Sequence, residues 1–318
     1  MRTLWPVLLC ALAACGGNFS NEDLEYLNAL PTRDALASKL PGSSGSSAGG
    51  GLTQRQDRLS VGDASQLYLD TQKASTDFNN GCDNLLGLLE NIRTVPPTTR
   101  EQGRRTWGPY PDSGHPGNML RFVMERDGDF FDYRLQFKPS AGAEQAWWSF
   151  LEGSFKADAG IRIGEGELHL FISEALARGL DVGDLRGLQR LDIGYQNKTL
   201  PTRVEMIFST PPTLPSTPSP GISYTYRELP AGFGEMRFLL QGTDVVLGGL
   251  KEDVEITTRW TPDHGGVSTF VILKGDLQGA SYKECWDSQY KLTFAKRSWE
   301  LFGIGLASSC TDVSGFDG

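Results

Sequence analysis

The sequence predicts an α+β fold that is mainly β: a large curved antiparallel meander sheet, bent into a partly closed barrel, packs on one long N-terminal helix. After residue 110, apolar and polar residues alternate in about a dozen segments, as in strands with one buried face. Mostly short turns join these segments without strand-helix-strand repetition, which favours antiparallel pairing. One stretch, 63–95, instead carries apolar residues at helical spacing. A sheet this large must curl, and we expect the helix on its concave side.

The chain starts with the pattern of an export signal. Arg2 precedes an apolar run that ends at Leu12 and is too short to cross ~30 Å of hydrocarbon. Leu-Ala-Ala then leads directly to Cys15, and this motif resembles the lipobox of bacterial lipoproteins. The resemblance implies a signal peptide over residues 1–14, cleavage after Ala14, and diacylglycerol and acyl chains bound covalently to Cys15. The alternative is an ordinary secretory signal with an incidental cysteine.

Lipid on Cys15 would decide where the protein resides. One acyl chain, at ~0.8 kcal/mol per buried methylene, binds a membrane only marginally, whereas two or three chains form a lasting anchor. We therefore expect an exported protein that is lipid-anchored to the bacterial envelope. The resemblance also favours the outer over the inner membrane, because Gly16 stands where inner-membrane lipoproteins of many bacteria carry Asp.

The acidic balance of the chain limits its partners. The sequence has 30 Lys and Arg against 39 Asp and Glu, and loss of Arg2 with the signal leaves 29 basic residues, a net charge of about −10. Such a charge argues against nucleic acid and against anionic lipid as electrostatic partners. The expected partners are thus the membrane, through the lipid anchor, and a lipid ligand or an envelope protein.

Three cysteines remain once the signal and the lipid site are set aside, and they allow three disulfide pairings. An exported location permits disulfides. We predict a bridge between Cys285 and Cys310, because it would tie down the C-terminal region and would stabilise the fold by roughly 3 kcal/mol through loop entropy. Cys82 falls on the apolar stripe of the predicted helix, where we expect a buried free thiol.

Residues 15–61 are predicted to form an acylated N-terminal region outside the folded domain. Acidic residues after Ser20 and leucines at helical spacing indicate a short helix that ends at Pro31, and 32–40 could form a second. From Pro41 the composition turns to Gly and Ser, which is typical of a flexible linker. The folded body, a single domain over 62–318, would hang from the lipid on this linker.

The long helix is predicted over 63–95. Apolar or small residues recur along one stripe, Asp63 and Gln66 make a capping pair, and Pro96-Pro97 prevents continuation. At ~1.5 Å per residue this helix would be ~50 Å long, enough to lie across a whole sheet. We expect one helix, with a bend at Asn79-Asn80-Gly81 as the alternative.

The β meander is predicted over 104–295 and is followed by a C-terminal tail over 296–318. The strongest hairpin signal joins 119–125 to 131–137 through an Arg-Asp-Gly-Asp turn. The other alternating segments, interrupted by a helix at 173–180, are 146–156, 161–172, 191–195, 204–208, 222–226, 236–240, 254–260, 267–273, 282–286 and 290–294.

Motifs for catalysis and metal binding are scarce. The three histidines, His115, His169 and His264, lack metal-ligand spacing, and no Gly-x-Ser-x-Gly elbow occurs. Glu165 and Glu167 would share one strand face, as in a glycosidase, but two acids beside solvent more often form only a polar face. We therefore expect no catalytic residues, no metal site, no cofactor besides the bound lipid, and no enzyme.

Three neighbouring aromatic residues, Trp147, Trp148 and Phe150, are the remaining candidates for a binding site. Side chains alternate between the two faces of a strand, so at least one of the three should face away from a single-sided core. Packing within a hairpin is the simpler interpretation. The functional interpretation is that these rings line a groove for an apolar ligand.

Several stretches together resemble a family of myxobacterial-type bacterial lipoproteins. The similarity rests on the lipobox, on 21–31 with the linker after it, on Pro96-Pro97 ahead of 105–110, and on 284–287. These stretches span most of the chain, but none is a catalytic motif, and the family implies no activity. In architecture alone, the predicted half-barrel is similar to periplasmic carriers of lipids and lipoproteins.

These observations favour a lipid-anchored envelope lipoprotein without catalysis. The first hypothesis is that its sheet and helix enclose a groove for a lipid or another apolar ligand. The second is a structural or protein–protein interaction module of the outer membrane, in which the helix simply fills the sheet. A hydrolase that uses Glu165 and Glu167 is the third and least favoured, because histidines are scarce.

Overall fold

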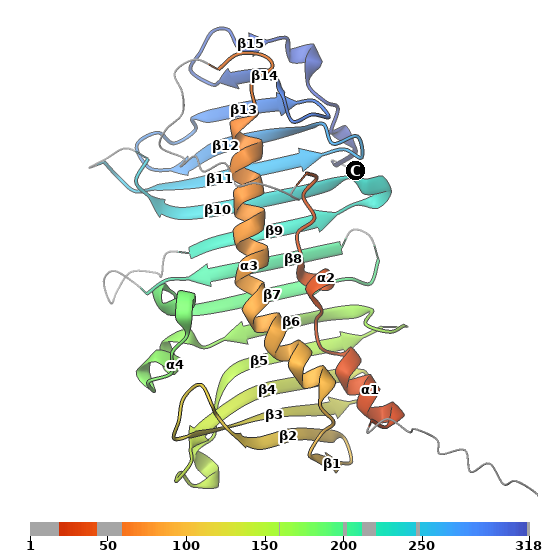
Figure 1. Cartoon of the computed structure of the whole chain (residues 1–318). Helices are drawn as coiled ribbons and strands as arrows, with labels where there is room; N and C mark the ends of the chain where they lie inside the picture. The colour runs from red at the N-terminus through yellow and green to blue at the C-terminus, as the bar shows by residue number, and fades with distance from the viewer. Residues whose placement is uncertain are drawn as a thin grey trace, which may run out of the picture.

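The structure is mainly β and consists of one 15-stranded antiparallel sheet in which β1 to β15 follow each other in chain order (Figure 1). This computed structural model describes residues 19–42, 59–158, 160–199, 202–211, 221–245 and 249–316. The predicted lipid site Cys15 lies outside these residues, as does the side chain of Cys82. The strands are β1 Thr99–Glu101, β2 Arg104–Pro111, β3 Asn118–Asp127, β4 Phe130–Pro139, β5 Trp148–Ala157, β6 Gly164–Leu170, β7 Arg190–Gln196, β8 Thr202–Ser209, β9 Gly221–Glu228, β10 Gly234–Thr243, β11 Glu252–Trp260, β12 Gly266–Lys274, β13 Ser281–Trp286, β14 Leu292–Arg297 and β15 Ile304–Gly305.

The sheet is open, so the prediction of a partly closed barrel is wrong. β1 and β15 lie at opposite ends of the sheet and do not pair with each other (Figure 1). At ~4.8 Å between strands, the sheet extends for roughly 70 Å across its strands. Closure is one way to cover the apolar face of a large sheet; here helices and an extended segment cover that face instead.

A long helix, α3 (Gln66–Thr94), crosses the strands on one face of the sheet, which we call the helix face (Figure 1). It matches the helix predicted over 63–95. Two short helices precede it, α1 (Asn21–Asn28) and α2 (Arg33–Leu36), and they correspond to the helix predicted before Pro31 and the second one predicted within 32–40. The N-cap is Ser65, whose hydroxyl accepts a hydrogen bond from the Tyr68 N–H at 3.3 Å. The predicted capping pair of Asp63 and Gln66 is therefore wrong.

The N-terminal segment 19–42 belongs to the folded body. It runs alongside α3 in the opposite direction, and its Tyr26, Leu27, Leu30 and Leu36 lie in the same hydrophobic core as the strands (Figure 1). We predicted this segment outside the domain that starts at 62. Segments 19–42 and 59–316 both contribute to one core, so the predicted Gly/Ser linker connects two parts of one body and does not separate the body from Cys15.

The N-terminus of α3 is fixed by a buried carboxylate on β13. Glu284 is fully buried, and its Oε2 accepts hydrogen bonds from the Ser65 hydroxyl at 2.6 Å and from the Leu67 N–H at 2.9 Å. Its Oε1 accepts a third, from the Tyr282 hydroxyl at 2.6 Å. A carboxylate next to the free N–H groups of a helix start is favourable both as an acceptor and through the helix dipole.

Glycines beneath aromatic rings set the close packing of the helix face. In four cross-strand pairs, a glycine on one strand faces an aromatic ring on the next, and a Cβ on the glycine would meet that ring closer than 3.0 Å. The rings therefore lie flat on the sheet, under α3 and segment 19–42. The pairs are Gly153 with Tyr133, Gly166 with Tyr195, Gly234 with Trp260, and Gly266 with Trp286.

The disulfide Cys285–Cys310 is present and confirms the predicted pairing. It joins β13 to the C-terminal segment, which covers the end of the sheet face opposite α3. Val267, Cys285 and Phe294 form a small apolar cluster there, and Val313 packs against it. The bridge thus secures a cover for the last strands on that face.

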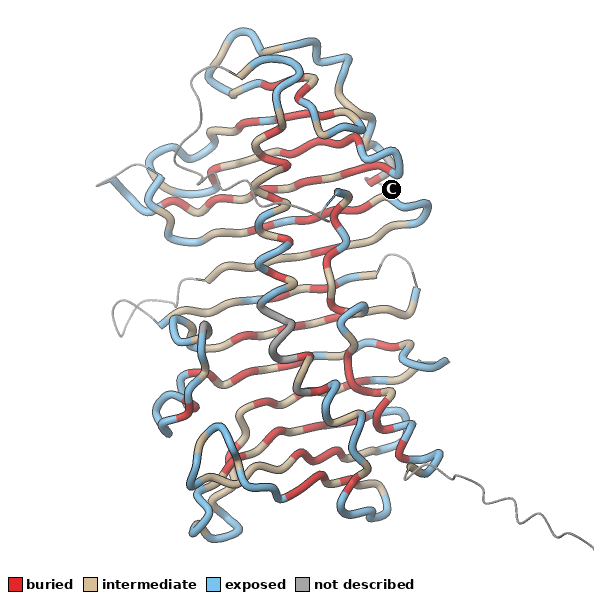
Figure 2. Tube along the Cα trace, in the orientation of Figure 1, coloured by how far each residue is buried: buried red, intermediate tan, exposed pale blue. Residues whose placement is uncertain are grey.

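Most predicted strands are present, including the hairpin of β3 and β4, which pairs Asn118 with Pro139 through Asp127 with Phe130. The predicted helix at 173–180 appears as the shorter α4 (Ile172–Ala177). Buried and exposed residues alternate along the strands, as expected for two different faces (Figure 2). Among the described helices, none combines the length and the apolar character that crossing a membrane requires.

Substitution of Gly153 tests the flat packing of the rings. We expect Gly153→Ala to destabilise the protein by about 1–3 kcal/mol, because the new methyl group would overlap the buried Tyr133 ring. Urea unfolding followed by circular dichroism measures the change. Gly194→Ala is the matched control: a Cβ at Gly194 meets nothing within 4 Å, so its stability should stay within about 0.5 kcal/mol of wild type. Equal effects of both substitutions would contradict this packing.

Asp23 fixes α1 to the first strands through a buried charge cluster. Its side chain accepts from Arg105 Nε at 2.7 Å and from Arg100 Nε at 3.0 Å, and it completes a capping box with Ser20. Burial alone raises the pKa of Asp23, but hydrogen bonds from the Ser20 backbone, Arg105, Arg100 and the Ser20 hydroxyl outweigh it and hold the pKa at about 2.

This low pKa predicts a pH-dependent contribution to stability. The pKa of Asp23 is lower in the folded state than its ordinary 3.8, so the carboxylate stabilises the fold above pH 4, and this contribution is lost as pH falls towards 2. We expect Asp23→Asn to cost about 2 kcal/mol at pH 7 and much less at pH 2. Urea unfolding of both proteins across this range measures the difference. A difference between the two proteins that is as large at pH 2 as at pH 7 would contradict the role of the Asp23 charge.

Candidate functional site

Among the described residues, no helix lies over the middle strands on the face opposite α3, which we call the outer face. Along β4 to β9 the side chains on this face are mostly charged or polar. An antiparallel sheet with one solvated face is stable provided the other face is buried, and the helix face meets that condition. The outer face is therefore a broad polar surface on a rigid support.

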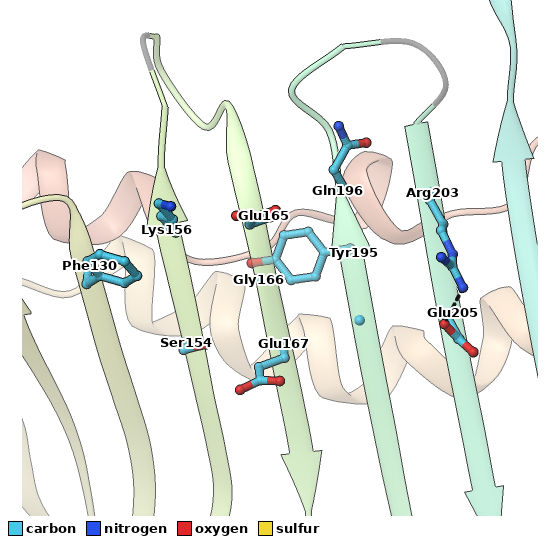
Figure 3. Close-up of a pocket in the computed structure, with 11 residues that line it drawn as sticks. Phe130, Ser154, Lys156, Glu165, Gly166, Glu167, Tyr195, Gln196, Arg203 and Glu205 are labelled. Atoms are coloured by element: carbon cyan, nitrogen blue, oxygen red, sulfur yellow. Dashed lines mark hydrogen bonds and ion pairs between the residues drawn. The ribbon is translucent and has the colours of Figure 1, made fainter.

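A trough lies on this outer face over β4 to β8, with a volume of about 420 Å³ (Figure 3). Two cross-strand rows of side chains border it. One row carries Lys156, Glu165, Gln196 and Arg203, and the other carries Ser154, Glu167, Gly194 and Glu205. Phe130 on β4 closes one end, and its ring is 53% exposed.

Small residues explain why the outer face is hollow here. Gly194 on β7 has no side chain, and it lies between Glu167 and Glu205 in the pairing register. Ser154 is the short side chain on the other side of Glu167. The long side chains around these two positions therefore stand above a depression whose floor is the backbone of the sheet.

Charges of both signs surround the trough. Lys198 Nζ lies 3.1 Å from Glu165 Oε1, and Arg203 donates to Glu205 Oε2 at 2.7 Å. Lys156 Nζ lies 5.3 Å from the centre of the Phe130 ring. Exposed ion pairs of this kind add little to stability, so the arrangement is better suited to binding than to holding the fold together.

His169 lies next to the trough in a chain of polar contacts. Its Nδ1 is 2.6 Å from Asp192 Oδ1, and its Nε2 is 3.7 Å from Glu167 Oε2. Asp192 also accepts from Arg190 Nε at 2.5 Å. Asp192 thus contacts both Arg190 and His169, and His169 lies between Asp192 and Glu167 at the border of the trough.

Glu165 and Glu167 do lie on one face of β6, as the sequence predicts, and both border the trough. Their side chains are 47% and 60% exposed. A general acid normally lies in an apolar pocket that excludes water, which neither position provides. Within the described part of the chain, no three His, Cys, Asp or Glu residues form a group that could hold a metal ion.

The structure places the predicted aromatic groove residues at the start of β5, away from the trough. Trp148 is 9% exposed, and its ring centre lies 5.8 Å from that of Phe137, which also contacts Phe150 at 6.2 Å. Trp147 lies under the guanidinium of Arg121 at 4.3 Å. All three rings therefore pack against other side chains of the β4–β5 hairpin or of the neighbouring β3.

The other residues of the trough were not candidates from the sequence. Ser154, Lys156, Gly194, Gln196 and Arg203 belong to three different strands, β5, β7 and β8, and only the register brings them together. The alternation within each strand does assign them to the solvated face. The alternation does not reveal which residues pair across neighbouring strands. The depression depends on such a pair, because Gly194 lies opposite Glu167.

No protein-family model matches this chain, and neither a curated protein nor a solved structure matches it. The candidate site therefore rests on the geometry described above.

Proposed function

We propose that this protein is a lipid-anchored envelope lipoprotein without catalytic activity that acts as a protein–protein interaction module. Its outer face binds another envelope protein, and the trough over β4 to β8 receives a protruding polar segment of that partner. The observation that carries this proposal is the contrast between the two faces: the helix face is filled by the chain itself, whereas the outer face is bare, charged and hollowed.

The filling of the helix face favours this function over transport of an apolar ligand. Phe78, Leu86 and Leu89 of α3 are each at most 1% exposed, and Phe78 packs 6.0 Å from the ring of Tyr224. Segment 19–42 occupies the space beside α3. An apolar groove of the kind that a lipid carrier uses would have to open where these side chains are already packed.

The charges of the trough indicate the chemistry of the partner. Basic Lys156 and Arg203 alternate with acidic Glu165, Glu167 and Glu205 around one depression. A surface that carries both signs selects a partner with a complementary pattern, because like charges brought into contact are unfavourable. A partner segment with both cationic and anionic side chains fits this pattern better than a polymer of one charge.

Site-specific cross-linking in cells tests the proposed interface. A photoreactive amino acid in place of Phe130, which closes one end of the trough and is 53% exposed, should form a defined adduct with one envelope protein. The same amino acid at Thr76, on the exposed side of α3, should not. The double substitution Arg203→Glu with Glu205→Arg keeps the ion pair but exchanges the positions of its positive and negative charges. It should reduce the yield of the adduct at least fivefold. Adducts that are equal at both positions, or that survive the swap, would contradict the proposal.

The anchor is tested separately by metabolic labelling. Wild type should incorporate radiolabelled palmitate and fractionate with the outer membrane, whereas Cys15→Ala should lose the label, because the thiol is the expected attachment atom. Absence of label in wild type would favour the ordinary secretory signal. Native mass spectrometry of the purified protein decides against the apolar-carrier alternative if it detects no bound lipid.

A further inference from the structure

Three hairpins at the β15 end of the sheet expose bulky apolar side chains along one side of the molecule. We call this set the apolar rim. In the β14–β15 loop, Trp299, Leu301 and Phe302 are 65%, 82% and 81% exposed. The remaining members are Val245 and Leu250 in the β10–β11 loop, and Leu273 and Leu277 around the β12–β13 turn.

Topology places these loops on the same side. In an antiparallel meander, every second turn leaves the sheet from the same side, and the β10–β11, β12–β13 and β14–β15 loops alternate in this way (Figure 1). The turns between them, 261–265 and 287–291, leave from the opposite side and carry no exposed bulky apolar side chain among the described residues. The exposed apolar side chains of these hairpins are thus on one side, whereas Leu306 and Val61, 70% and 57% exposed, lie outside the hairpins and are not part of the rim.

The form of the rim fits a bilayer better than a protein. Neighbouring loops are two strands apart, or about 10 Å, so the apolar side chains form separate projections instead of a continuous groove. A folded partner would need a matching set of hollows, whereas the interfacial layer of a membrane adapts to any row of projections. Trp, Phe and Leu are also the residues that insert at this depth.

A cavity beside Phe302 provides a place for a lipid headgroup. It measures about 440 Å³, lies at the β13–β15 end, and is lined by Lys296, Arg297, Glu300 and Tyr282 besides Phe302. Arg297 is paired with Glu300 at 2.8 Å, so Lys296 is the other cation of the lining and the one suited to a phosphate group next to the inserted side chains. Elsewhere on the rim, Lys251 is paired with Asp244, so the rim as a whole does not depend on anionic lipid.

We propose that the apolar rim inserts into the interfacial layer of a phospholipid bilayer, with a lipid phosphate held in the cavity beside Phe302. This contact is distinct from the lipid on Cys15, because the rim lies at the other end of the sheet from α1 (Figure 1). It would exist whether or not Cys15 is acylated.

Vesicle binding of the chain carrying Cys15→Ser tests this proposal without the anchor. Sedimentation with phosphatidylcholine vesicles should recover the protein. The emission of Trp299, obtained as the difference from Trp299→Phe, should shift to shorter wavelength and be quenched by brominated lipid. Leu301→Asp with Phe302→Asp should weaken binding about tenfold or more, because two apolar side chains leave the membrane. Both positions are more than 80% exposed, so thermal unfolding should be unchanged.

The matched control is Ile161→Asp in the β5–β6 turn, a residue that is 76% exposed on the opposite side of the sheet. It should bind vesicles like wild type. Failure of the parent protein to bind, with unshifted Trp299 emission, would overturn the proposal and point to a protein as the partner of the rim. Binding that requires anionic lipid and survives the double substitution would overturn it as well, because charge alone would then explain the attraction.

Discussion

The structure depends on the need to bury one face of a very wide sheet. A 15-stranded sheet that does not close exposes an apolar face along its whole width, and a single helix of 29 residues, α3, covers much of it. Segment 19–42 covers the strip beside α3. The glycines under Tyr133, Tyr195, Trp260 and Trp286 let these rings lie flat, so that the helix can approach. Side chains, not sheet closure, therefore define the thickness of the core.

This solution leaves the chain with surfaces of different character. On the helix face, α3 and segment 19–42 cover much of the sheet with side chains that are packed in the core. The outer face remains available, and its trough exists only because Gly194 and Ser154 are small. At the β13 end, the disulfide between Cys285 and Cys310 attaches the C-terminal segment to the outer face. The last strands are therefore covered on this face, whereas the middle strands stay open.

Local patterns predicted most of the fold, and long-range geometry accounts for what they missed. Alternation located the β3–β4 hairpin, and an apolar stripe located α3, because both signals lie within one element. Closure of the sheet depends on whether its first and last strands meet, which no local pattern encodes. The burial of Tyr26 and the alignment of Gly194 with Glu167 depend on distant partners in the same way. Glu165 and Glu167 were assigned to one face correctly, but the rest of their surroundings came from four other strands.

The packing of segment 19–42 changes how far the protein can reach from a membrane. Phe19 already packs against the core, so only residues 16–18 separate the folded body from Cys15. Four residue steps span at most ~14 Å. If Cys15 is acylated, the α1 end of the sheet stays within that distance of the headgroups. The orientation of the molecule is then restricted to pivoting about this end, and the trough can meet only partners that come close to the lipid surface.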